Sequence, residues 1–118
     1  MNIEEFREYC LSKKSVTESF PFDETTLVFK VAGKMFALTD THDDFSINLK
    51  CDPEKAIELR ERYPVVIPGY HMNKKHWNTV NIDGSIPNDL VYQWIDDSYN
   101  LIVEKLPRSL WEELLSKK

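Results

Sequence analysis

The feature that most constrains the fold is a change in hydrophobic period that begins near residue 26. In residues 26–31, TLVFKV, every second side chain from Leu27 onward is apolar, and residues 45–50, FSINLK, repeat this alternation. A period of two predicts a β-strand with one face on a core. Residues 34–39 form an apolar run between them, and turn residues stand at Gly33 and in residues 41–44. The sequence therefore predicts a three-stranded antiparallel meander with one wet face.

Helical patterns flank this meander. Asn2 can cap a helix in which Glu5 completes a capping box, and Asp52 followed by a proline can open a second helix. Ala56, Ile57 and Leu59 are the expected inner contacts of the second helix. The predicted helices are residues 2–13, 52–62, 87–105 and 108–116, and the remaining strands are residues 64–68, at a sheet edge, and residues 77–82.

The resulting order, α-β-β-β-α-β-β-α-α, predicts the α+β fold class. One antiparallel sheet of about five strands would carry the helices on its apolar face. A chain of 118 residues has the usual size of one domain, so residues 1–118 are expected to form a single unit. Pleat alternation places a mainly polar set on the opposite sheet face: Lys30, Asn48, Lys50, Trp77, Thr79 and Asn81.

The charge of the chain limits its partners. The formal net charge is −5, whereas a general nucleic-acid binder normally carries a basic footprint. The charge is uneven, because residues 1–29 and 83–118 each have a net charge of −3 and residues 30–82 have a net charge of +1. Any anion-binding function is therefore expected in this middle segment.

Cysteine usage and hydropathy predict the surroundings of the protein. Cys10 and Cys51 are too few for a disulfide framework, and both fit a reducing compartment. No window approaches the roughly 20 apolar residues of a membrane span, and the N-terminus lacks a basic and then apolar leader. We expect a cytoplasmic protein, a monomer more readily than an oligomer, that makes no membrane contact.

Residues 68–80, PGYHMNKKHWNTV, concentrate the residue types that could carry chemistry. His71 and His76 are five positions apart, which does not suit a helical zinc pair, and the closest acid is Asp83. The chain also has no nucleophile elbow, no paired catalytic carboxylates and no phosphate loop. We therefore expect no catalytic residues, no metal and no cofactor, and hence not an enzyme.

Contact with an anion or a nucleic acid matches this segment better. A lysine pair and two histidines in a loop, with a tryptophan in the adjoining strand, combine phosphate charge with a stacking platform. Two further lysines would share the sheet face. A hairpin loop with solvated lysines and a tryptophan that covers the sheet edge remains the alternative. The residues of this candidate surface are Lys30, Lys50, His71, Lys74, Lys75, His76 and Trp77.

Four linked segments carry a resemblance to a known family. They are SFPFDETTLVFKVAGKMFAL at residues 19–38, NLKCDPEKAIELRERY at 48–63, PGYHMNKKHWNTVNIDGSIP at 68–87, and the pair SY at 98–99. In order and spacing, over nearly the full length, the chain resembles the MmcQ/YjbR family. The resemblance implies a frataxin/CyaY-like α+β fold and DNA binding through two hairpin wings. The wings would be the turn at 32–34, which adds Lys34 to the candidate residues, and the loop at 71–76.

The leading hypothesis is a small non-enzymatic domain that binds DNA or another phosphate-bearing ligand through one sheet face and its loops. The five lysines would contact phosphates, the two histidines would donate hydrogen bonds, and Trp77 would stack. A protein-interaction module is the alternative, in which Trp77, Tyr70 and Met72 would anchor a partner. A third hypothesis, a small-molecule enzyme that uses His71 and His76, requires a concave pocket around a histidine.

Overall fold

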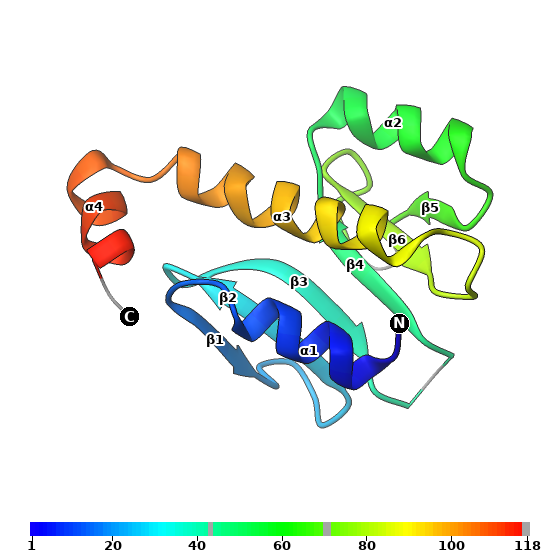
Figure 1. Ribbon diagram of the computed structural model, residues 1–118, viewed down its shortest axis with the longest axis horizontal. Helices are drawn as coiled ribbons and strands as arrows, with labels where there is room; N and C mark the ends of the chain where they lie inside the picture. The colour runs from blue at the N-terminus through cyan, green and yellow to red at the C-terminus, as the bar shows by residue number, and fades with distance from the viewer. Residues whose placement is uncertain (43, 70–71, 117–118) are drawn as a thin grey trace.

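Four helices and six strands follow one another in the computed structural model, which describes residues 1–42, 44–69 and 72–116 (Figure 1). The predicted fold class, α+β with an antiparallel sheet, is confirmed, with six strands in place of about five. The elements are α1 (Ile3–Leu11), β1 (Val16–Ser19), β2 (Thr26–Val31), β3 (Lys34–Asp40), β4 (Ser46–Lys50), α2 (Pro53–Arg62), β5 (Val66–Pro68), β6 (Trp77–Asn81), α3 (Asn88–Glu104) and α4 (Arg108–Ser116).

The six strands form one sheet in the order β1-β2-β3-β4-β6-β5, with every neighbouring pair antiparallel. The strand that was not predicted, β1, pairs with β2 along its whole length from Val16 opposite Val31. The strand conformation of β1 is stabilised by this pairing, and an ion pair between Arg7 and Glu18, with nitrogen and oxygen 2.6 Å apart, links the strand to α1. The sequence of β1 itself gives little indication of a strand. The sheet therefore begins one strand earlier than the alternation indicated.

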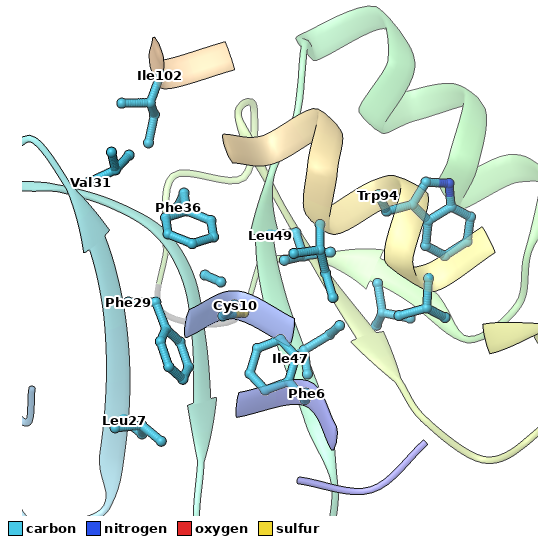
Figure 2. Packing of buried hydrophobic residues seen from close by; sticks show 14 of the residues in the cluster. Phe6, Cys10, Leu27, Phe29, Val31, Phe36, Ile47, Leu49, Trp94 and Ile102 are labelled. Carbon is cyan, nitrogen blue, oxygen red and sulfur yellow. The ribbon is translucent and has the colours of Figure 1, made fainter. Parts of the chain in front are cut away.

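One sheet face carries the main core, under α1 and α3 (Figure 2). Phe6 of α1 meets Phe29 of β2 edge to face, with ring centroids 5.5 Å apart, and Ile47 lies between α1 and the sheet. The predicted capping box of α1 is present, because Asn2 accepts from the Glu5 backbone and the Glu5 side chain accepts from the Asn2 backbone. The capping box fixes where α1 begins, and Phe6, the first buried residue of the helix, therefore meets the sheet in a fixed position.

Helix α3 is fastened across two neighbouring strands by one buried side chain. Ser98 Oγ donates to the Phe36 carbonyl of β3 and accepts from the Lys50 amide of β4, the latter at 2.9 Å. Farther along, Ile102 packs near Val31 (Figure 2). The position of α3 over β3 and β4 is therefore set by two hydrogen bonds as well as by apolar contact.

Helix α2 lies on the same side of the sheet, over β5 and β6. It buries Ala56 and Leu59, as predicted. The expectation for Ile57 is wrong, because its side chain is 51% exposed. A helix turns about 100° per residue, so Ile57, which follows the buried Ala56 directly, points away from the sheet, whereas Leu59 faces it again. No helix in the described part of the chain is long and apolar enough to cross a membrane.

Candidate functional site

The second sheet face, on the side away from the helices, is called the outer face here. Its centre holds a small apolar cluster of Val28, Leu38 and Trp77, against which Met35 and Met72 pack. The expectation of a wet face is therefore wrong at its centre, where Val28 is fully buried. Two loops contribute side chains to this face. Phe22 comes from the loop ahead of β2, and Met72 comes from the loop ahead of β6.

Beside this cluster the outer face is hollowed by about 720 Å3, and we call this space the outer hollow. The floor of the outer hollow is a row of residues that runs across three paired strands. In this row Leu38 is opposite Asn48, and Asn48 is opposite Thr79. Thr79 Oγ1 donates to Asn48 Oδ1 at 2.5 Å, which holds these two polar side chains together. The outer hollow is lined by Phe22, Asp23, Thr26, Met35, Leu38, Asp40, Ser46, Asn48, Met72, Asn73 and Thr79.

Trp77 does not have the exposure that a stacking platform needs. It points to the outer face as predicted, but only 7% of it is exposed. Gly69 lies directly beside it on the adjoining segment, because the Gly69 amide donates to the Trp77 carbonyl at 2.8 Å. A Cβ on Gly69 would lie 2.7 Å from the Trp77 Cβ, so only glycine fits there without a shift. The expectation of an exposed Trp77 is wrong, because the loop ahead of β6 folds down onto the ring.

This loop carries the second set of candidate residues. Lys74 and Lys75 are exposed and His76 is half-buried, whereas His71 and Tyr70 lie outside the described residues. Arg60 of α2 donates to the Lys74 carbonyl at 3.2 Å, and Asn73 Oδ1 accepts from the Lys75 amide at 2.9 Å. The two lysines are therefore displayed on backbone that is tied to α2.

The outer face also carries candidate lysines that belong to strands rather than to this loop. Cα pairing places Lys50 opposite Trp77 and Lys30 opposite Met35, so these residues belong to the same face. Lys34 follows the tight turn at Ala32 and Gly33, which have φ values of 53° and 76°. The three lysines thus meet near the end of the sheet where β2 turns into β3 and β4 ends.

A fourth lysine joins this group from α3. Burial lowers the pKa of Lys50, and the positive charges of Lys105 and Lys34 lower it further. Within residues 1–42, 44–69 and 72–116, none of Lys30, Lys34, Lys50 and Lys105 forms an ion pair. We call these four residues the lysine group. Lys105 was missed from the sequence because it follows α3, and only the packing of α3 brings it near Lys50.

The opposite end of the outer hollow is acidic. Asp23 accepts hydrogen bonds from the Thr25 and Thr26 backbone amides at 2.9 and 2.7 Å, and these bonds lower the pKa of its carboxyl group. Asp40 also lines the hollow, and its Oδ1 accepts from the His42 amide. The outer face therefore runs from carboxylates at one end to lysines at the other. Among the described residues, no three His, Cys, Asp or Glu side chains are grouped so that they could hold a metal ion.

The fold and the outer face define a small α+β domain with helices on one side of its sheet and loops on the other. The model of the YjbR family matches residues 11–101, and the chain belongs to this family. The resemblance to the MmcQ/YjbR family is thereby confirmed.

Curated relatives extend over most of the chain. Uncharacterized protein YjbR of Escherichia coli K12 is 36% identical over 108 residues, which is 91% of this chain and 92% of the relative. Uncharacterized protein YbdF of Escherichia coli O157:H7 is 42% identical over 90 residues, covering 75% of this chain and 74% of its own. The range of the family match, residues 11–101, includes all six strands of the sheet.

Solved structures agree with the fold. Protein DR2400 of Deinococcus radiodurans has a TM-score of 0.91 and 41% identity, over 96% of this chain and 87% of its own. A protein from Pseudomonas syringae has a TM-score of 0.74 and 29% identity, over 86% of this chain and 98% of its own. The described fold is therefore shared with proteins solved by experiment.

Proposed function

We propose that this chain is a cytoplasmic, non-enzymatic domain that binds a phosphate-bearing ligand, with double-stranded DNA as the first candidate. The lysine group and the exposed pair Lys74 and Lys75 would contact phosphates. The observation that carries the proposal is that Lys34 and Lys105 lie close enough to Lys50 for their charges to lower its pKa. Lys30 lies on the neighbouring strand β2, and none of the four lysines has an ion-pair partner among the described residues. Unpaired cations from several elements form a surface that an anion would stabilise.

The buried Trp77 decides which kind of nucleic acid fits best. Single-stranded ligands gain much of their affinity from bases that stack on exposed aromatic rings. Trp77 is covered, so its part is to support Met72 and the loop rather than to stack. His76 is half-buried beside that loop and would donate a hydrogen bond, and the same part is proposed for His71. Contact would then be to the phosphate backbone, which favours a duplex without sequence preference.

Fluorescence anisotropy with labelled duplex and single-stranded DNA tests this proposal. We expect duplex binding that weakens steeply between about 50 and 200 mM salt. The double variant Lys34→Glu/Lys105→Glu should reduce the salt slope by about two units, because each lost phosphate contact removes about one. The matched control Arg7→Glu/Arg62→Glu makes the same charge change on α1 and α2, at two arginines that do not belong to the lysine group. Equal binding by the two double variants would contradict the proposal.

A protein or peptide partner is the second candidate, since exposed apolar side chains stand beside the outer hollow. Phe22 is 64% exposed and lines the hollow, and Phe20 is half-exposed on the same loop. On this proposal the hollow receives an apolar side chain of the partner. Binding that resists salt and is lost in Phe22→Ser, but kept in Ile57→Ser on α2, would favour this function over phosphate binding.

A further inference from the structure

A second cavity lies on the helix side of the sheet, between α2 and α3. We call this space the α2–α3 cleft. Its volume is about 330 Å3, within the range of roughly 300–1,000 Å3 that is usual for small-molecule sites. The cleft exists because α2 packs over β5 and β6 while α3 packs over β2, β3 and β4, so the sheet between them is uncovered. Leu49, Asn78 and Val80 line it from the sheet, and Leu59, Trp94 and Leu101 line it from the helices.

One residue of this cleft has a hydrogen-bonding capacity that the fold does not use. Asn78 is 3% exposed, and its Nδ2 donates to the Ala56 carbonyl at 3.2 Å. Its Oδ1 is buried and has no partner in the described part of the chain. The amide cannot be turned to relieve this, because the oxygen would then face the Ala56 carbonyl. Buried acceptors without a donor are rare, so this oxygen needs an explanation.

The polar groups near Asn78 are also mainly acceptors. Asp52 and Asp97 line the cleft close to Cys51, because both carboxylates add to the effect of burial in raising the pKa of that thiol to about 11. Lys55 lies at the same rim, but its ammonium pairs with Glu58 at 3.8 Å. Lys50 also lines the cleft, and its ammonium group lies within reach of the charges of Lys105 and Lys34. Near Asn78, a molecule that enters the cleft meets carboxylate and amide oxygens above apolar walls, and it has to supply the donor for Asn78 Oδ1 itself.

We propose that the α2–α3 cleft binds a small aromatic molecule that carries an N–H donor, such as an amino-substituted ring. The ring lies against Trp94 and the leucines, an N–H group donates to Asn78 Oδ1, and further amino character is directed toward Asp52 and Asp97. The buried oxygen has no donor from the described part of the chain, so an N–H group of the ligand would satisfy it. The covering side chains have to move apart for this contact. Lys50 belongs both to the lysine group and to the lining of this cleft, so the two proposals are tested on different residues: Asn78 here, and Lys34 and Lys105 for phosphate binding.

The chain contains its own reporter of occupancy. Cys10 is fully buried in the core, whereas Cys51 is partly exposed and lines the cleft. A thiol reagent such as DTNB at about pH 8.5 should therefore label Cys51 well before Cys10, since the thiolate is the reactive form and access is required. We expect 2-aminobenzimidazole and adenine, at millimolar concentrations, to slow this labelling and to shift the Asn78 side-chain amide signals in NMR spectra. The counterpart 1,2-dimethylbenzimidazole, which has no N–H donor, should bind about three- to tenfold more weakly.

Two variants separate the role of Asn78 from the stability of the fold. Asn78→Leu keeps the size of the side chain, and Ala56 keeps its bond from Arg60 Nε at 3.2 Å, so the fold should be retained. In this variant we expect the donor-bearing and donor-free probes to bind equally. Asn100→Trp starts from an exposed position at the rim, and it should fill the cleft and abolish probe binding. Absence of protection and of NMR shifts by both amino probes, or unchanged discrimination in Asn78→Leu, would overturn the proposal.

Discussion

The two faces of the sheet are formed by the same six strands and yet are covered in different ways. Beneath α1 and α3, large side chains such as Phe6, Phe29 and Ile47 are fully buried. On the outer face, two loops cover a cluster of three buried residues beside a hollow of about 720 Å3. A helix supplies a continuous apolar stripe, whereas a loop supplies one or two side chains. Helices therefore fill one face, and loops leave room on the other.

The largest expected effect belongs to the helix-covered face. Phe29→Ala should lower the free energy of unfolding by about 4 kcal/mol, because it removes a fully buried ring that α1 and the sheet cannot close over. Urea unfolding followed by circular dichroism measures this loss. A loss below that of Trp77→Ala would contradict the contrast between the faces.

Trp77→Ala should cost less, about 3 kcal/mol, although tryptophan is the larger residue. The loop that carries Met72 can settle into part of the vacated space, whereas α1 is held over Phe29 by its buried residues Phe6 and Cys10. Amide hydrogen exchange should accelerate at Met72 and Gly69, while amides of α1 keep their relative protection. Uniform acceleration throughout the sheet would show that both faces belong to one cooperative core.

Gly69→Ala tests the closeness of the loop to the outer face. The added methyl group would lie 2.7 Å from the Trp77 Cβ and 3.0 Å from its carbonyl oxygen, so we expect a loss of about 2 kcal/mol and a changed near-ultraviolet signal from tryptophan. The control Gly84→Ala has open space around it and a φ of 87°. It should cost about 1 kcal/mol from backbone strain and leave the tryptophan signal unchanged. Equal spectra for both variants would place the loop farther from Trp77.

The lysine group predicts a dependence of stability on alkaline pH. Since burial and then Lys105 and Lys34 lower the pKa of Lys50 in the folded state, the unfolded chain binds more protons just below the ordinary value of 10.5. The Lys50 contribution therefore makes the fold more stable as pH rises through that window. Lys50→Met should remove this rise, whereas Lys75→Met, on the exposed loop, should not. Thermal unfolding of the variants and the parent between about pH 8 and 10.5 compares them, and parallel curves would contradict the prediction.

The smallest effect is expected at Ile57, on the outer side of α2. Ile57→Lys should change the free energy of unfolding by no more than about 0.5 kcal/mol, because the side chain is already half in solvent. Chemical denaturation is sufficient to measure it. A loss of several kcal/mol would restore the original interpretation of Ile57 as an inner residue.

The regular elements were predictable because each has a local cause. The capping box at Asn2, the proline after Asp52 and the alternation in residues 26–31 all act within a few positions along the chain. Strand β1 has no such cause, since Val16 is the one aliphatic residue in VTES and the strand is stabilised by its partner. Local patterns predict an element, whereas pairing between distant segments has to be seen in the structure.

The candidate surface was predictable only in part for the same reason. Pleat alternation correctly directed Trp77 to the outer face, but it contains no information about the loop that covers the ring. Lys105 joins Lys50 through the packing of α3, and the α2–α3 cleft depends on how two helices diverge over the sheet. Asn78 stands between Trp77 and Thr79, which were assigned to the outer face, and it was the one available signal of that cleft, because an amide among core residues needs partners.

The order of strands in the sheet has a consequence for how the chain folds. Strands β1 to β4 follow one another and pair with their neighbours, whereas β6 reaches β4 only after residues 51–76 have been passed. Closing this longer loop costs entropy before its contacts form, while the hairpins close over short turns. The first four strands should therefore assemble early, and β6 should complete the sheet late. The outer hollow, which is lined by Thr79 of β6 and by Met72 ahead of it, would then acquire its final shape only in the last step of folding.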